Sequence, residues 1–471
     1  MLSTKEESSS QEEILDRIKE TLITKVPAYL SSNPLNFTGS ENDIVDYRVK
    51  DCNVEILDTH ELAFHGASRM YAAEIYLEEE RKKKKQLNVH HVIVKIMPRN
   101  PIVRSMQNSV DQFYNECTIL SSIIPFLLEN CESTGHKNVS ETSCGIQSKF
   151  DVIPKCYYSC HDPEDGIVVL EDLRKQGYKI GGNKMMLMDE DHIRVALQGL
   201  ARFHALSYAT KNKDFEGYKQ HVVTKLADAR RYFDKSTTDF SIDRYSTFLK
   251  YTTRIMLLEL NKLQLEDGRL YTEKIMKLCE KLESYQELFY ELMTPKEPLA
   301  VLCHGDFNRN NMLFCYDSTN RPVGVKILDF QTPYYASPAI DLGLVLLLNS
   351  TPELLSTEWD NLFCEYNGIL RKTLSDFLEC SEESLPSEYS VEGFKNEFSR
   401  HGIYCFMIAC TFITSLAMND YETDTFIKLA DRGFPSLEEA GELMRSTVAS
   451  DVEVARRLTL LSQVFLDNIS V

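Results

Sequence analysis

The sequence has no apolar run long enough to span a membrane. Its longest apolar stretch, residues 404–418, is shorter than the roughly 20 residues that a membrane-spanning helix needs, so we expect a buried helix there. The first residues are polar and acidic and lack the apolar core of a secretory signal. These absences predict a cytoplasmic protein without a membrane partner.

The sequence also has fewer basic residues than acidic residues. The chain of 471 residues carries 52 Lys and Arg against 71 Asp and Glu, which gives a formal net charge of -19. Such a field repels phosphates, so we expect no nucleic-acid partner, and any phosphate site must be made locally. The run from Arg81 to Lys85 is interpreted as a solvated hairpin tip, with nuclear targeting as the alternative.

The 13 cysteines show no regular spacing, and their number is odd. In a chain of this length, that pattern favours a reducing compartment over a disulfide framework. Cys156 and Cys160 have no second ligand pair at zinc spacing, so we expect no structural metal there.

Hydrophobic periodicity predicts a change of architecture along the chain. Residues 12–29 have apolar side chains at i, i+4 spacing, which is typical of a helix. Short β-rich runs separated by turn and charge signals then predict an antiparallel sheet, with one helix before its last two strands. The strands are expected at residues 54–57, 70–77, 89–96, 154–158 and 167–170, and the helix at 110–128.

Beyond residue 191 the pattern is helical, apart from a strand-like interval at residues 300–330. Helices are expected at residues 193–208, 244–265, 272–293, 352–377, 397–418 and 452–466. This order predicts an α+β fold of two lobes. We expect a helical extension at residues 1–46, a small antiparallel-sheet N-lobe at 47–173 with a solvent-exposed insertion at about 129–149, and a large, mainly helical C-lobe at 174–471.

One polar segment carries the strongest chemical signal. In His304-Gly-Asp-Phe-Asn-Arg-Asn-Asn311, Asp306 lies five residues before Asn311, and Asp329 follows after a second strand-like run. Phosphoryl transfer from ATP needs a carboxylate that accepts the hydroxyl proton, and an amide oxygen and a second carboxylate that hold Mg²⁺. A lone Asp and Asn at this spacing would be only a loop signal, but the whole string is far more specific.

With these motifs, the sequence resembles the ecdysteroid kinase-like (CHK kinase-like) family, which is related to aminoglycoside and choline kinases and shares their protein-kinase-like fold. The resemblance implies that Asp306 is the catalytic base and that Asn311 and Asp329 are magnesium ligands. It also implies that Asp341 supports the catalytic loop, whereas a carboxylate that stabilises a helix start is the simpler interpretation. His204, in a segment that resembles the family's helix below the hinge, is interpreted as a satisfied core histidine.

The N-lobe supplies the expected nucleotide contacts. Lys95 ends an apolar strand and Glu116 lies on the next helix, which matches the lysine and glutamate of kinases, although a strand lysine alone usually faces solvent. The segment with Leu170, Glu171 and Leu173 resembles the family's inter-lobe hinge, whose backbone would meet adenine. Gly66 is the single glycine of the expected phosphate-covering turn, where a protein kinase has three.

Several features are missing for a protein kinase. Only eleven residues separate Asp329 from Asp341, which leaves no room for a long activation segment, and no Ala-Pro-Glu motif follows. Gly305 stands where an arginine would pair with a phosphorylated activation loop. Family members commonly have Trp at position 308, which is Asn here, and Gln331 stands where the magnesium triplet of protein kinases has glycine.

We therefore expect a kinase that uses ATP and Mg²⁺ to phosphorylate a hydroxyl of a small molecule. The resemblance suggests an ecdysteroid or another apolar alcohol. The alternative is a catalytically silent protein that keeps the fold to hold an apolar ligand or a partner. The acceptor, its hydroxyl and the oligomeric state do not follow from the sequence.

Overall fold

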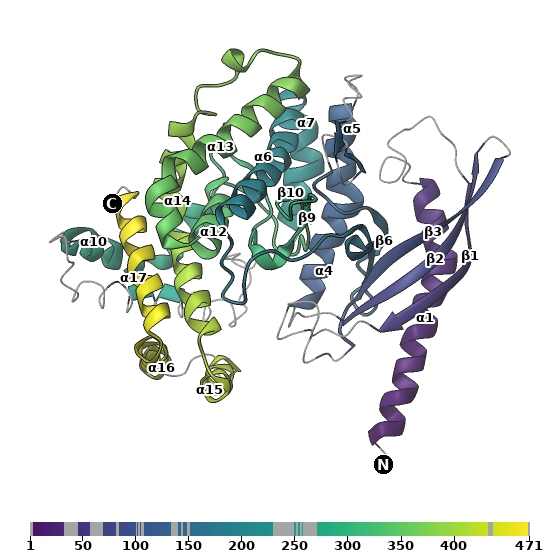
Figure 1. The fold of residues 1–471 in the computed structure, drawn as a ribbon, viewed down its shortest axis with the longest axis horizontal. Helices are drawn as coiled ribbons and strands as arrows, with labels where there is room; N and C mark the ends of the chain where they lie inside the picture. The colour runs from purple at the N-terminus through teal and green to yellow at the C-terminus, as the bar shows by residue number, and fades with distance from the viewer. Residues whose placement is uncertain are drawn as a thin grey trace.

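The computed structural model describes residues 3–32, 46–56, 69–81, 84–99, 101, 104, 108–132, 140–142, 145–147, 151–228, 249–250, 253–254, 257, 271–431 and 437–469. Two lobes are visible in Figure 1, a sheet with a long helix on the right and a helical body on the left. This confirms the expected α+β fold of two lobes.

The N-lobe is one antiparallel sheet in the order β1-β2-β3-β7-β6. The strands are β1 (Asp46–Ile56), β2 (Arg69–Arg81), β3 (Lys84–Ile96), β6 (Cys156–Cys160) and β7 (Ile167–Glu171). Arg81 pairs with Lys84, so the basic run does fall at a hairpin end, although residues 82 and 83 lie outside the described part of the chain.

Helix α1 (Ser3–Ser32) covers one face of this sheet. Its buried residues Ile18, Leu22 and Val26 follow one another at i+4, so they form one apolar stripe along the helix. The stripe packs on Ile75, Val94 and other residues that alternate along the strands. Alternation sends the intervening side chains, such as Ile93 and Lys95, to the opposite face of the sheet.

A nearly continuous helix links the sheet to the C-lobe. It consists of α4 (Ser109–Thr118), a π-helical turn (Ile119–Ile123) and α5 (Ile124–Glu132). Its apolar residues, such as Phe113 and Leu120, belong to the C-lobe core and not to the cluster under α1. The helix that carries Glu116 is therefore anchored in the C-lobe.

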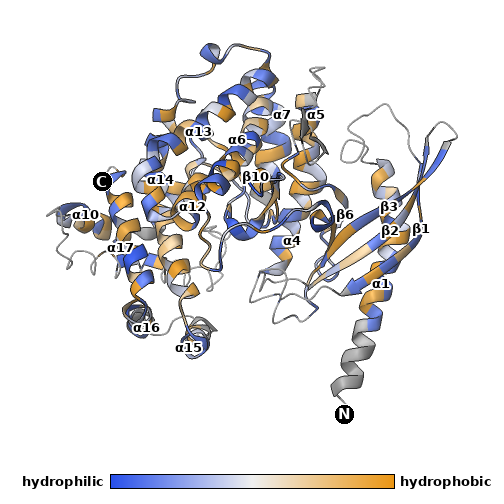
Figure 2. Ribbon diagram, in the orientation of Figure 1, coloured by the Kyte–Doolittle hydropathy of each residue, from blue (hydrophilic) through white to orange (hydrophobic). Residues whose placement is uncertain are grey.

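The C-lobe packs helices around two short antiparallel sheets of two strands each (Figure 1). One sheet pairs β8 (Val301–Cys303) with β11 (Tyr334–Ala336), and the other is the hairpin of β9 (Met312–Tyr316) and β10 (Pro322–Ile327). The helices are α6 (Glu190–Lys213), α7 (Phe215–Tyr218), α8 (Thr224–Asp228), α10 (Thr272–Glu283), α11 (Tyr285–Met293), α12 (Ala339–Asn349), α13 (Pro352–Leu378), α14 (Val391–Leu416), α15 (Asp420–Asp431), α16 (Leu437–Ser450) and α17 (Val452–Asp467). Figure 2 shows that α12, at the centre, is mostly apolar.

Some expectations need correction. The helix expected at residues 272–293 is broken at Ser284 into α10 and α11. Helix α12 was missed because every one of its residues is buried, so it has no polar face to give a period of 3.6. Most of the helix expected at 244–265 and most of the insertion at 129–149 lie outside the described residues, although α5 reaches Glu132 and a small hairpin pairs Ser140–Thr142 with Gly145–Gln147.

Contrary to the expectation that no apolar run is long enough to span a membrane, one helical stretch among the described residues, Val391–Ala417, is long and apolar enough by length and composition alone. Of its apolar window, 67% is buried inside the structure.

Candidate active site

The catalytic loop follows β8 and turns on Gly305. Its backbone is left-handed, with φ of 83°, a conformation that favours glycine. A Cβ at this position would lie 1.7 Å from the carbonyl oxygen of Thr332. The segment that follows Asp329-Phe330-Gln331 therefore lies directly against the catalytic loop. This close contact requires glycine at position 305.

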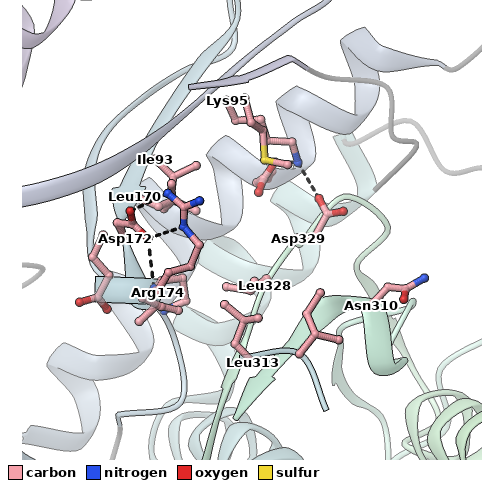
Figure 3. A pocket seen from close by; sticks show the side chains of 15 residues that line it. Ile93, Lys95, Leu170, Asp172, Arg174, Asn310, Leu313, Leu328 and Asp329 are labelled. Atoms are coloured by element: carbon pink, nitrogen blue, oxygen red, sulfur yellow. Dashed lines mark hydrogen bonds and ion pairs between the residues drawn. The ribbon is translucent and has the colours of Figure 1, made fainter. Parts of the chain in front are cut away.

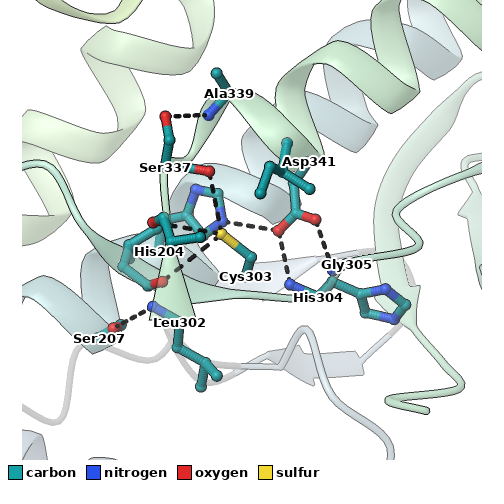
Figure 4. Close-up of polar contacts among 12 residues, drawn as sticks. His204, Ser207, Leu302, Cys303, His304, Gly305, Ser337, Ala339 and Asp341 are labelled. Atoms are coloured by element: carbon teal, nitrogen blue, oxygen red, sulfur yellow. Dashed lines mark hydrogen bonds and ion pairs between the residues drawn. The ribbon is translucent and has the colours of Figure 1, made fainter. Parts of the chain in front are cut away.

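Asp341 holds the catalytic loop through hydrogen bonds to its backbone, as Figure 4 shows. Its carboxylate is fully buried and accepts the backbone N–H of His304 at 2.7 Å and that of Gly305 at 2.8 Å. Asp341 also lies in the first turn of α12, so the simpler interpretation, a helix-start carboxylate, describes its position too.

His204 on α6 is the third partner of Asp341. Its Nε2 lies 3.1 Å from Asp341 Oδ2, and its Nδ1 lies 2.7 Å from the hydroxyl of Tyr366. Because a carboxylate accepts, Nε2–H donates to Asp341 and Nδ1 accepts from Tyr366. His204 is thus a satisfied core histidine that orients a loop-holding carboxylate.

Cys303 lies beside this pair, and the three ligand atoms are within 4.8 Å of one another. The Cys303 thiol donates to the carbonyl of Ser337 at 3.3 Å, while His204 and Asp341 bond each other directly. We interpret the cluster as a hydrogen-bonded support and not as a metal site.

Asp306 lies in the catalytic loop between two asparagine amides. One of its carboxylate oxygens accepts the side-chain amide of Asn308 at 2.7 Å, and the other accepts that of Asn311 at 2.8 Å. Burial raises the pKa of Asp306 to about 6, and the negative charge of Asp329 adds to this, against the lowering effects of His304 and of both amides. A carboxylate with a pKa close to neutrality suits a general base.

Asn308, at the position where the family commonly has Trp, makes polar contacts on both sides. Its Oδ1 accepts the backbone N–H of Asn310 at 3.0 Å and so caps the short 3₁₀ turn Arg309–Asn311. Its amide group holds Asp306. The substitution thus replaces an aromatic ring with a residue that fixes the catalytic loop.

Asn311 and Asp329 form a candidate metal centre. The β9–β10 hairpin joins them, and the N–H of Leu328 donates to the carbonyl of Asn311 at 2.9 Å. The side-chain oxygen of Asn311 is buried and has no hydrogen-bond partner among the described residues, which is costly unless a ligand satisfies it. Asp329, with φ of 66°, adds a carboxylate, so the donor set fits Mg²⁺.

Lys95 connects this centre to the N-lobe (Figure 3). Its Nζ lies 2.8 Å from Glu116 Oε2 and 2.6 Å from Asp329 Oδ1. Burial alone would lower the pKa of Lys95, but the two carboxylates outweigh it and raise the pKa. The contact with Glu116 brings together the lysine and glutamate expected from the sequence.

The helix that carries Glu116 also touches the metal triplet. The side-chain amide of Asn115 donates to the carbonyl of Gln331 at 2.7 Å. This bond joins α4 to the segment that follows Asp329, so Glu116 and Asp329 are held relative to each other.

A cavity of about 120 Å³ extends from Lys95 to the hinge (Figure 3). Its apolar walls come from both lobes, and Lys95, Glu116 and Asp329 close one end. The apolar lining includes Met70, Ile93, Leu170, Leu173, Leu313 and Leu328. An apolar slot with charges at one end suits a nucleotide whose base is flat and whose phosphates are anionic.

The expected hinge residues line this cavity in different ways. Leu170 and Leu173 contribute apolar surface. The carboxylate of Glu171 is held by the N–H of Lys155 at 2.8 Å and by Lys326 at 3.3 Å. Burial opposes these partners, but Lys326, the N–H of Lys155 and Gln176 together outweigh it and lower the pKa of Glu171. The backbone N–H of Glu171 donates to the carbonyl of Lys155 at 3.0 Å, so both its side chain and its N–H are engaged within the fold. Gly66 and its turn lie outside the described residues.

The sequence interpretation missed several cavity residues. Ile93 lies two residues before Lys95, and strand alternation alone could have placed both on one face. Arg174 lines the cavity and forms a two-pronged pair with Asp172 at 2.9 and 2.8 Å, which spacing in the sequence does not reveal.

A search of curated proteins found no match. The ethanolamine kinase of Plasmodium vivax is 12% identical, with a TM-score of 0.34 over 85% of this chain and 81% of its own. The aminoglycoside phosphotransferase APH(2″)-IIia, solved as a GDP and kanamycin complex, is 12% identical, with a TM-score of 0.35 over 90% of this chain and 99% of its own.

A family model covers more than half of the sequence. The match spans residues 65–378, which includes the cavity, the catalytic loop and Asp341. The chain, a phosphotransferase of kinase-like fold, therefore belongs to the ecdysteroid kinase-like family.

Proposed function

We propose that this protein transfers the γ-phosphoryl group of ATP to a hydroxyl of a small molecule. The observation that carries the proposal is the meeting of five side chains from both lobes: Lys95, Glu116, Asp306, Asn311 and Asp329. Positioning and charge stabilisation account for most of the catalysis of phosphoryl transfer, and these five groups supply both.

Each side chain has a distinct task. Lys95, held by Glu116, places a positive charge at the end of the cavity where the phosphates of a bound nucleotide would lie. Asp306 orients the acceptor hydroxyl and takes its proton. Mg²⁺, held by the Asn311 oxygen and the Asp329 carboxylate, would neutralise charge on the phosphates.

A small acceptor is favoured over a protein. β11 takes up three of the eleven residues between Asp329 and Asp341 and pairs with β8, so this short interval offers no extended segment on which a peptide could lie. The family name suggests an ecdysteroid, and we propose an apolar alcohol of this kind as the acceptor.

Mass spectrometry of reaction products tests the function. The protein is incubated with labelled ATP, Mg²⁺ and a metabolite extract, and new phosphate esters are sought. Esters should form with the wild type and not with Asp306→Asn. If no ester forms although ATP binds, the silent binding protein is the better description.

We also propose a cytoplasmic location. Every cysteine in the described part of the chain is a free thiol, in keeping with a reducing compartment. Imaging of a fluorescent fusion tests this, and a nuclear signal that depends on the basic run ending at Lys85 would contradict it.

A further inference from the structure

A second and larger cavity lies in the C-lobe. It measures about 340 Å³ and is enclosed by α10, α11, α14 and α17. Figure 1 shows α10 and α17 on the side of the C-lobe away from the N-lobe. The cavity shares no lining residue with the nucleotide cavity, and its volume is within the range of small-molecule sites.

The floor of this cavity combines apolar side chains with one polar atom. Leu278, Leu292, Ile403 and Phe465 are buried and line it. His401, only 2% exposed, lines it too. Its Nδ1 donates to the carbonyl of Glu397 at 3.0 Å, so Nε2, on the other side of the ring, is the atom left for a ligand.

Nε2 of His401 is an unpaired acceptor. It has no hydrogen-bond partner in the described part of the chain. Burial and the nearby Lys296 and Arg400 lower the pKa of His401, against the effect of Glu397, so the ring is neutral at pH 7. A neutral ring that donates through Nδ1 accepts through Nε2, and it therefore suits a hydroxyl group.

The rim of the cavity does not select an ion. Lys281, Lys296 and Arg400 are balanced by Glu287 and Glu291 at the rim and by Glu397 beneath Arg400. Lys296 pairs with Glu291 at 3.6 Å. A neutral ligand fits this mixture better than an anion or a cation does.

Buried hydrogen bonds connect the cavity to the catalytic loop. Glu397, beside His401, accepts the hydroxyl of Ser337 at 2.6 Å. The carbonyl of Ser337 accepts the thiol of Cys303, the residue before His304 (Figure 4). A molecule in the cavity would therefore act on the loop from behind, separated from Asp306 by buried protein.

We propose that this cavity is a second small-molecule site, which binds a neutral apolar molecule through one hydroxyl donor and stiffens the catalytic loop through Glu397 and Ser337. The site does not depend on phosphoryl transfer, so its test needs no turnover.

Equilibrium dialysis of the full chain with 1-naphthol and naphthalene tests the binding. One net hydrogen bond of about 1 kcal/mol should make 1-naphthol bind about 5-fold more tightly. In His401→Phe, which keeps the volume and loses the acceptor, the two probes should bind equally. Equal binding to the wild type, or a preference that persists in His401→Phe, overturns the proposal.

Two cavity-filling variants locate the probe. Ile403→Trp should abolish 1-naphthol binding, whereas Leu313→Trp, which fills the nucleotide cavity instead, should leave it unchanged. The reverse result places the probe in the nucleotide cavity and overturns the proposal. Circular dichroism checks that both variants are folded. If Ile403→Trp is unfolded, the relative binding of the two probes to His401→Phe decides instead.

Hydrogen exchange measures the coupling. With 1-naphthol bound, a peptide covering residues 301–311 should exchange more slowly, and a control peptide covering 69–81 should not change. Ser337→Ala should keep 1-naphthol binding and lose the slowing. If 1-naphthol does not slow exchange at residues 301–311 in the wild type, the proposed coupling between the cavity and the catalytic loop is wrong.

Discussion

Asp306 has to be ionised to accept a proton, but its surroundings oppose ionisation. Burial and the charge of Asp329 raise its pKa to about 6, while two asparagine amides donate to the ionised form. The balance leaves the base ionised at pH 7, with a proton affinity higher than that of an ordinary aspartate. A stronger base takes a hydroxyl proton more readily.

Two measurements on Asp306 follow. Turnover in the wild type should rise with pH through about 6 and level off above 7, because only the ionised carboxylate accepts a proton. Asp306→Asn should lower turnover about 10²–10⁴-fold and leave nucleotide affinity by calorimetry nearly unchanged. Loss of nucleotide binding in this variant would show that the residue is structural.

Lys95 neutralises two buried carboxylates in addition to facing the phosphates. Lys95→Met should weaken ATP use, and it leaves Glu116, only 1% exposed, without a counter-charge. Removing one partner of a buried pair costs about 3–5 kcal/mol, so the melting temperature should fall.

The double variant Lys95→Met/Glu116→Gln separates these effects. It should recover much of the melting temperature and none of the activity, because the stranded charge is gone but the cation is still missing. Full activity of Lys95→Met at low ATP would remove Lys95 from the site.

At the scale of elements, the β9–β10 hairpin joins the two proposed metal ligands, and Asn311 before it also holds the proposed base Asp306. Asp329→Ala should abolish magnesium-dependent turnover, and Asn311→Ala should reduce it less, since one carboxylate remains. The amide of Asn311 also lowers the pKa of Asp306, so Asn311→Ala should shift the pH midpoint of turnover upward. An unchanged midpoint and an unchanged magnesium dependence would contradict both roles.

Elements with a strong local pattern could be predicted. The stripe of Ile18, Leu22 and Val26 identified α1, and a polar loop between two strand-like runs identified the hairpin that joins Asn311 to Asp329. Helix α12 has no polar face, and Ser284 breaks a pattern that continues on both sides of it. Neither feature shows in periodicity.

Contacts between distant segments were beyond single-sequence reasoning. Lys95 meets Asp329 across 234 positions, and His204 meets Asp341 across 137. Resemblance to a family supplied the first group of residues, and it placed His204 in the core, but no pattern in this chain paired His204 with Asp341. Its partners Asp341 and Tyr366 come from two other helices, which only the packed structure brings together.

At the scale of the whole molecule, the two apolar cores are separate. The sheet and α1 share one core, and α4 belongs with the C-lobe. The stability of the N-lobe therefore depends on α1, while the nucleotide cavity lies on the opposite face of the sheet.

Leu22→Ala tests this arrangement. Leu22 is fully buried against the sheet, so the substitution should cost about 2–5 kcal/mol and lower the melting temperature. The neighbouring Ile23, which is exposed, provides the control, since Ile23→Ala should have little effect. Nucleotide affinity should be kept by both variants, and a selective loss in Leu22→Ala would place α1 in the site.

The close contact between Gly305 and Thr332 has a consequence for how such an enzyme can be controlled. Many kinases are silenced by a flexible stretch after the metal triplet, which folds away until a phosphate is attached to it. Here that stretch is short, contains β11 and lies against the catalytic loop, so a phosphate added to it would release no folded-away segment. We therefore expect that phosphorylation of this stretch does not switch the protein on.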